Sequence, residues 1–150
     1  MAGAEGHFIV DASSIVRAAL TDGSAAARLL DALLDRGLFA SSAAILDEME
    51  DVLRRPKFRQ KRSEEWMQAF GLRIRVTARL VVPDVSVREC RDRSDDKYLE
   101  AALAASRLHD PVQLVTIVSD DQDLLALDPW RGEVRILKPE AALAALANAA

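Results

Sequence analysis

The fold is decided by one stretch of sequence, which reads Gln113-Leu114-Val115-Thr116-Ile117-Val118 and continues Ser119-Asp120-Asp121-Gln122-Asp123-Leu124-Leu125. Its first part is an apolar run without polar alternation at its centre, which is typical of a strand buried on both faces. Its second part places carboxylates directly after that strand. Ligands of open parallel sheets bind beyond the carboxyl ends of the strands. The stretch therefore predicts both a buried parallel strand and the edge at which a functional site would lie.

Four other short apolar runs are also expected to be strands, and longer segments with helical spacing separate them. Of these four, Val134–Leu137 likewise lacks polar alternation at its centre and is expected to be buried on both faces. Strands that alternate with helices predict βαβ units, hence an α/β fold in which helices cover both faces of a central, mainly parallel five-stranded sheet. The other expected strands are His7–Val10, Leu38–Ala40, Leu80–Val82 and Val134–Leu137. The expected helices are Ser13–Thr21, Ser24–Arg36, a segment from Ser42 to before Pro56, Ser63–Arg79, Asp92–Ser106, Gln122–Leu127 and a last one after Pro139.

Length and composition limit the class of protein. A chain of 150 residues with a net charge of −4 supports a single domain over 1–150, with a core over about 7–146 and an alanine-rich tail from Ala141. The single Cys90 excludes an internal disulfide and any multi-cysteine zinc site. Met1 to Gly6 lack a signal-peptide pattern, and no apolar stretch is long enough for a membrane span. We therefore expect a cytoplasmic protein that has no membrane partner.

Acidic residues occupy the ends of the expected strands and the starts of helices. Asp11 directly follows the first strand, and Asp121 and Asp123 follow the fourth. Asp95 and Asp96 stand at the start of a helix, and Glu48 lies inside another. Each has a structural alternative, since an Asp in a first turn can cap its helix and Glu48 can be a solvated helix residue. Asp11 is the hardest to explain structurally, because nothing local requires a carboxylate there.

Carboxylates that converge repel one another. At about 5 Å and an effective dielectric near 20, each pair costs roughly 3 kcal/mol. A bound cation relieves this cost, and oxygen ligands without neighbouring His or Cys favour Mg²⁺ or Mn²⁺. Such a metal lowers the pKa of a bound water and stabilises charge on a phosphoryl oxygen. If the acids meet, their chemistry is that of phosphodiester hydrolysis.

Four pieces of the sequence, in this order, resemble the PIN-domain nucleases, and most closely the VapC-like toxin components of toxin–antitoxin systems. They span most of the chain between His7 and Leu137. The pieces are Phe8-Ile9-Val10-Asp11-Ala12-Ser13, the helix Ile45 to Arg54 with Arg55-Pro56-Lys57-Phe58, the segment Asp92-Arg93-Ser94-Asp95-Asp96-Lys97-Tyr98-Leu99-Glu100-Ala101-Ala102, and Ile117 to Leu125.

The resemblance implies a three-layer α/β/α fold and a metal-dependent endoribonuclease, the toxin of a type II toxin–antitoxin pair. It maps the catalytic acids to Asp11, Glu48, Asp96 and Asp121, with Asp95 as the rival of Asp96. The implied metal ligands are Asp11, Asp96, Asp121 and Asp123, with Ser13, Ser119 and Asp95 in support. Two departures from the family pattern are Ser13 after Ala12, and Ser119-Asp120 before the fourth acid. The extra carboxylate of Asp120 would alter metal affinity.

RNA binding has one candidate segment, residues 54–62, in which six of nine residues are basic. Arg54, Arg55, Lys57 and Arg59 are the candidate phosphate contacts, and a solvated loop that offsets an acidic helix is an equal alternative. The resemblance also implies an RNA substrate, a cognate antitoxin and a homodimer. Two alternatives stay open: a PIN-like module that binds RNA or protein without cleavage, and a phosphoacceptor receiver domain that would use Asp84 and Lys138.

Overall fold

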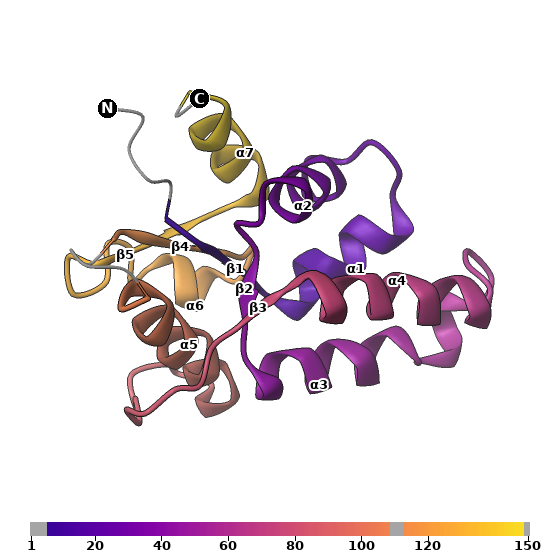
Figure 1. Cartoon of the computed structure of the whole chain (residues 1–150). Helices are drawn as coiled ribbons and strands as arrows, with labels where there is room; N and C mark the ends of the chain where they lie inside the picture. The colour runs from indigo at the N-terminus through magenta and orange to yellow at the C-terminus, as the bar shows by residue number, and fades with distance from the viewer. Residues whose placement is uncertain (1–5, 109–112, 149–150) are drawn as a thin grey trace.

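The computed structural model describes residues 6–108 and 113–148, and it is built from strands that alternate with helices (Figure 1). The strands are β1 (Phe8–Val10), β2 (Ala40–Ser41), β3 (Arg79–Leu80), β4 (Val115–Val118) and β5 (Val134–Leu137). The helices are α1 (Ala12–Leu20), α2 (Ala25–Arg36), α3 (Ala43–Leu53), α4 (Glu64–Thr77), α5 (Asp96–Ser106), α6 (Gln122–Leu125) and α7 (Pro139–Asn148). Two short 3-10 helices, η1 (Pro56–Phe58) and η2 (Arg93–Asp95), precede α4 and α5.

The strands are parallel, but they form two sheets and not the single five-stranded sheet that the sequence predicted. The larger sheet has the order β1-β4-β5, and β2 pairs with β3 in the smaller. One isolated parallel bridge, Phe8 to Phe39, connects the two, with the Phe8 N–H donating to the Leu38 carbonyl at 2.8 Å. The connection stops there because the chain turns into α3 at Ser42, whose hydroxyl accepts a hydrogen bond from the Ile45 N–H and caps that helix.

Two apolar clusters lie on opposite faces of the strands, which gives three layers. Successive strand residues point to opposite faces, so Phe8 and Val10 of β1 pack with α1 and α2 while Ile9 packs with α5. Figure 1 shows α2 and α7 on one side of the larger sheet and α5 on the other. The helices α3 and α4 extend away from the sheet as a pair, which we call the helical arm (residues 43–77).

The acidic loops that follow β1 and β4 each end at an aspartate that caps the next helix. Asp11 is the N-cap of α1 and Asp121 is the N-cap of α6, so each strand of the pair β1 and β4 ends at or close to a carboxylate that begins a helix. The Asp11 N–H donates to the Val118 carbonyl at 3.0 Å, which ties the end of β1 to the end of β4. The two acidic loops therefore lie side by side at the carboxyl edge of the larger sheet.

Candidate active site

Asp11 is a buried carboxylate at this edge. Only 5% of its surface is exposed, and its Oδ1 accepts a hydrogen bond from the Ser14 N–H at 2.9 Å. Burial raises the pKa of Asp11 above its usual value, although hydrogen bonds from Ser119 and Ser14 act in the opposite direction. A carboxylate whose ionisation is disfavoured by burial gains from any positive charge brought to its free lone pairs.

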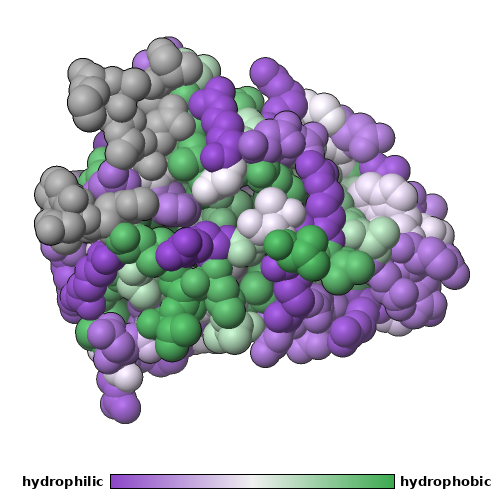
Figure 2. Space-filling view, viewed as in Figure 1, coloured by the Kyte–Doolittle hydropathy of each residue, from purple (hydrophilic) through white to green (hydrophobic). Residues whose placement is uncertain are grey.

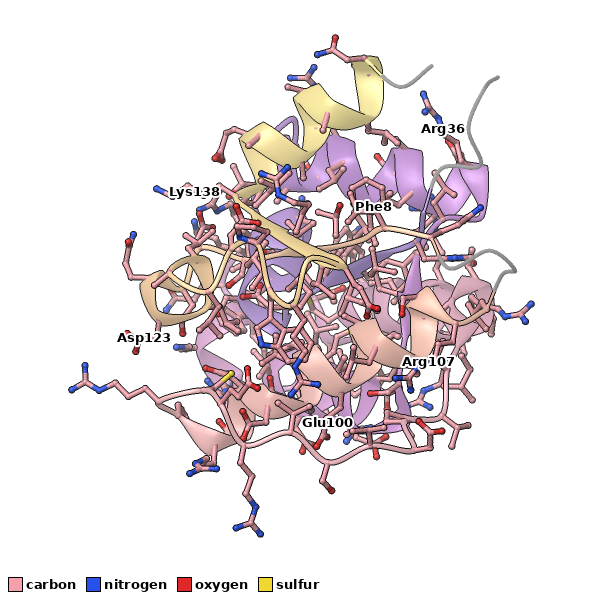
Figure 3. The ribbon with its side chains drawn as sticks, turned by 90° about the vertical axis from the view of Figure 1, so that its left-hand side faces the viewer. Phe8, Arg36, Glu100, Arg107, Asp123 and Lys138 are labelled. Carbon is pink, nitrogen blue, oxygen red and sulfur yellow. The ribbon has the colours of Figure 1, made fainter. Side chains whose placement is uncertain are left out.

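Ser119 joins Asp11 to the loop of Asp121. Its buried hydroxyl donates to Asp11 Oδ2 at 2.5 Å and accepts from the Asp121 N–H at 3.0 Å. Asp121 Oδ1 accepts from the Asp123 N–H at 2.8 Å and so closes the first turn of α6. Asp123 itself is exposed on α6, at the outer edge of the molecule in Figure 3. One hydroxyl therefore fixes the geometry between two predicted catalytic loops.

Glu48 reaches the same region from the helical arm through two consecutive residues of α5. The Tyr98 hydroxyl donates to Glu48 Oε1 at 2.7 Å and accepts from the Ala12 N–H at 3.1 Å, next to Asp11. Lys97 Nζ pairs with Glu48 Oε2 at 2.6 Å. Tyr98 is buried, and burial raises its pKa, so it stays a proton donor toward Glu48. Tyr98 thus links Glu48 to the loop of Asp11.

Asp95 and Asp96, the two rivals at the start of α5, face different surroundings. Asp96 is buried, and its Oδ1 accepts hydrogen bonds from the N–H groups of Glu89 and Cys90 at 3.1 and 2.8 Å. Burial acts to raise its pKa, but these hydrogen bonds outweigh it and the pKa lies below its usual value. Burial, together with the negative charges of Asp121, Asp92 and Glu48, raises the pKa of Asp95 to about 6.

Asp96 is therefore bound to the backbone of residues 89–90, whereas the negative charges of Asp121, Asp92 and Glu48 act on Asp95. These contacts favour Asp95, the rival in the sequence mapping, and the mapping to Asp96 stays a prediction. The 3-10 turn η2 ends at Asp95 and α5 begins at Asp96. The side chains of these two neighbours therefore leave the backbone in different directions. Spacing along the sequence could not resolve a difference of one residue.

Asp120, the extra carboxylate, is held on the outside. Its Oδ2 pairs with Arg17 at 2.5 Å, and Arg17 also pairs with Glu140 of α7 at 3.1 Å. Its charge still contributes to the raised pKa of Asp11.

Ser13, a predicted supporting residue, is exposed in the first turn of α1.

The sequence analysis missed Arg17, Lys97 and Tyr98 as site residues. The hydroxyl of Tyr98, among the apolar residues of its helix, is the one signal in the sequence that could have marked it out.

Comparison with known proteins decides the family. A family model described as the PIN domain matches residues 7–123, well over half of the chain. The chain belongs to the PIN domain family. PIN domains are generally nucleases and usually use divalent metal ions. The fold is similar to that in the crystal structure of PAE2754 from Pyrobaculum aerophilum, with a TM-score of 0.62 at 18% identity over 95% of this chain and 90% of that one. No curated protein matches the chain.

The carboxylates of this PIN domain suit a hard cation by chemistry but do not yet form a coordination sphere. Within residues 6–108 and 113–148, no group of three or more His, Cys, Asp or Glu side chains is arranged to hold a metal ion. The hydrogen bonds explain why, since Glu48 is turned onto Lys97 and Tyr98, and Asp121 onto the first turn of α6. Asp121 uses only Oδ1 in these contacts and keeps Oδ2 for a cation, whereas both carboxylate oxygens of Glu48 are engaged, so metal binding would draw Glu48 away from Lys97.

The basic segment 54–62 lies at the far end of the helical arm of this PIN domain, around η1 (Figure 1). Arg54 pairs with Glu50 and Asp51, both at 3.7 Å, and Arg59 pairs with Glu64 at 3.7 Å. Lys57 lies over the Phe58 ring, and Arg55 is exposed. These are the four residues predicted to contact RNA, and two of them have carboxylate partners.

In the described part of the chain, no helix has both the length and the apolar character needed to cross a bilayer.

Proposed function

We propose that this PIN domain is a metal-dependent endoribonuclease that hydrolyses RNA phosphodiester bonds with Mg²⁺ or Mn²⁺. The observation that carries the proposal is the buried Asp11 carboxylate, joined through the Ser119 hydroxyl to the Asp121 loop, in a family of nucleases. A divalent cation bound there would lower the pKa of a water molecule and stabilise charge on the phosphoryl oxygens. Burial of Asp11 keeps its interaction with a cation strong, because water screens it little.

The proposed roles follow the placement of each side chain. Asp11 and Asp121 would anchor the metal, Asp95 and Glu48 would complete the acidic set, and Asp123 would act from the outer side of α6. Ser119 would hold Asp11 and Asp121 in register, and Ser13 would support the same loop. In this proposal Asp95 takes the place that the sequence assigned to Asp96, and Asp96 fixes the loop that precedes α5.

Cleavage of a labelled single-stranded RNA, with Mg²⁺ or Mn²⁺ and then with excess chelator, tests the proposal. We expect cleavage to require the metal and Asp11→Asn to lower its rate by at least about 100-fold, since a metal ligand supplies several kcal/mol of transition-state stabilisation. Asp51→Asn is the matched control, because Asp51 is an exposed residue of α3. Full activity in chelator, or equal loss in the control, would contradict the proposal.

A second candidate function is a module that binds RNA or protein without cleavage. One observation favours it, namely that the described residues contain no ready group of three metal-ligating side chains. In that case Glu48 and Lys97 would stay paired, and divalent metal would neither raise the melting temperature nor start cleavage. The receiver-domain alternative loses its basis with the family match, and Asp84, its required phosphoacceptor, is an exposed residue paired with Arg107 at 3.4 Å.

We further propose that the protein is the cytoplasmic toxin of a type II toxin–antitoxin pair and forms a homodimer. Exposed apolar side chains support a protein interface: Figure 2 shows them gathered across one face, over the end of α4 and the segment after β3. They are Leu72, Val76, Leu80 and Val82, with exposed fractions between 55% and 80%. Patches of this kind mark interaction sites. Sedimentation of the chain alone tests the dimer, and a small neighbouring reading frame whose product binds the chain tests the antitoxin.

A further inference from the structure

A groove lies between the start of α5 and the loop that precedes it, and we call it the α5 groove. Its volume is about 430 Å³, and its lining consists of three basic residues, two carboxylates and three others, namely Arg88, Arg93, Lys97, Asp96, Glu100, Ser86, Val87 and Ser94. That volume lies within the roughly 300–1,000 Å³ of typical ligand sites. Glu100 accepts a hydrogen bond from the Val87 N–H at 2.9 Å and Asp96 from the Cys90 N–H at 2.8 Å, so backbone groups hold both carboxylates. The basic residues outnumber these carboxylates, which suits an anionic ligand.

The arginines of the loop that precedes α5 extend into solvent. Among the described residues, Arg88, Arg91 and Arg93 are exposed and none forms an ion pair or a side-chain hydrogen bond. In Figure 3, side chains tipped with nitrogen extend into solvent from the loop that precedes α5. Exposed guanidinium groups of this kind are available to a ligand.

The carboxylates of the same loop are occupied instead. Glu89 pairs with Arg131 at 2.7 Å and accepts a hydrogen bond from Trp130. Asp92 accepts from the Ser94 N–H at 2.9 Å, and Asp96 binds the backbone of residues 89 and 90. The negative charges are therefore held by backbone or partner groups while the arginines point outward.

The α5 groove adjoins the proposed cleavage site. Arg93 and Asp95 belong to the same 3-10 turn, and Lys97 lines the groove while its Nζ pairs with Glu48. Fully extended, the six residues from Arg88 to Arg93 reach about 20 Å, so the loop spans only a few nucleotides of one strand. A phosphate held in the groove would place a neighbouring phosphodiester beside the carboxylates.

We propose that the α5 groove, through Arg88 and Arg93 and together with the exposed Arg91 of the same loop, binds the phosphate groups of a single nucleic-acid strand and so guides it to the carboxylates. This inference rests on the proposed nuclease function for its choice of ligand. Guanidinium groups match phosphate oxygens with two parallel hydrogen bonds and are always charged. Contacts to phosphates are independent of sequence and position the strand rather than read it.

Binding of a fluorescently labelled single-stranded RNA, followed by anisotropy in chelator over a salt series, tests the inference without any cleavage. The variant Arg88→Gln/Arg91→Gln/Arg93→Gln should bind at least about tenfold more weakly at low salt. Its slope of log affinity against log salt should be shallower by about 2, since single strands give about 0.7 per phosphate contact. The matched control, Arg54→Gln/Arg55→Gln/Arg59→Gln, removes the same charge from the helical arm. We expect its affinity to stay within about twofold of the wild type, because these residues lie at the far end of the helical arm, away from the α5 groove (Figure 1).

Three results would overturn the assignment. Wild-type affinity in the first variant would remove the α5 groove from RNA binding, and loss only in the control would move the phosphate contacts to residues 54–62. An equal loss in both variants would show only a general effect of charge. Binding of a poly-glutamate peptide in place of RNA would indicate an acidic protein partner. If wild type and Asp11→Asn both bind RNA through the groove but neither ever cleaves it, the nuclease proposal fails while this inference stands.

Discussion

Residues 54–62 and residues 88–93 both carry arginines, but the two segments use them differently. In the first, Arg54, Arg59 and Arg62 have carboxylate partners, and Arg62 also donates to the Ala19 carbonyl at 2.9 Å. In the second, the carboxylates are taken up by backbone N–H groups or other partners and the arginines stay exposed. The number of basic residues is higher in the first segment, while exposed guanidinium groups beside the carboxylates occur in the second. The comparison teaches that position and pairing decide which cations can bind a ligand.

The largest expected effect is on the cleavage rate, and it separates Asp95 from Asp96, the two neighbouring carboxylates that follow the second segment. We expect Asp95→Asn to lower metal-dependent RNA cleavage by about 100-fold, since a charge facing the metal is lost. Asp96→Asn should stay within a few-fold of the wild type, because its amide oxygen can still accept from the N–H groups of Glu89 and Cys90. Initial cleavage rates at saturating Mg²⁺ decide between them. The reverse order would return Asp96 to the metal site and leave Asp95 as a helix-start residue.

A second comparison concerns stability. Asp96→Ala leaves the buried N–H of Cys90 and the partly buried N–H of Glu89 without an acceptor, and we expect it to lower the free energy of unfolding by about 2 kcal/mol. Asp51→Ala breaks only an exposed pair with Arg54 at 3.7 Å, so its effect should stay below about 0.5 kcal/mol. Urea denaturation measures both. Equal effects would mean that the carboxylate before α5 does not hold its loop.

We also expect arginines of the two segments to differ in their contribution to the free energy of unfolding, by a smaller amount than Asp96 and Asp51 do. Arg62 donates to Ala19 and Asp22 and lies 4.3 Å from the centre of the Trp66 ring. We therefore expect Arg62→Gln to lower the free energy of unfolding by about 1 kcal/mol. Arg88→Gln should change it by less than about 0.5 kcal/mol, since Arg88 is exposed. Thermal melts at one ionic strength suffice, and a destabilised Arg88→Gln would show that the second segment also uses its arginines for folding.

The smallest effect is a pH dependence of stability from Asp95. Burial and nearby negative charge raise its pKa from 3.8 to about 6 in the folded protein, so between these values the folded state holds a proton that the unfolded chain has released. The free energy of unfolding therefore falls as pH rises through this window, and Asp95→Asn should flatten that fall. Asp92→Asn is the control of opposite sign, because hydrogen bonds from Ser94 lower the pKa of Asp92. Melting temperatures between about pH 2 and 7 test both, since the lowered pKa puts the effect of Asp92 below its ordinary value of 3.8. An unchanged profile in Asp95→Asn would contradict the influence of Asp121 and Glu48 on Asp95.

Much of the architecture was accessible from the sequence. The apolar run Val115–Val118 matches β4, which is almost entirely buried, and the α/β class with parallel pairing is confirmed. The expectation that Val134–Leu137 is buried on both faces was wrong, because Arg135 of β5 is exposed and pairs with Asp128 at 2.9 Å. The prediction of one five-stranded sheet was wrong in detail, since the chain leaves β2 for α3 after two strand residues. Local patterns show that a strand exists, but not how far its ladder extends.

The sequence by itself determined the strand and helix order, the family, and the presence of acids at the ends of β1 and β4, because periodicity, caps and short motifs are local properties of the chain. Only the tertiary structure decided that Asp96 binds the backbone of residues 89 and 90, that Tyr98 joins Glu48 to the Asp11 loop, and which arginines stay exposed. These depend on contacts between residues far apart in sequence and on the direction of a side chain after a single turn. The folded chain fixes both through burial and hydrogen bonding, which spacing along the sequence does not record.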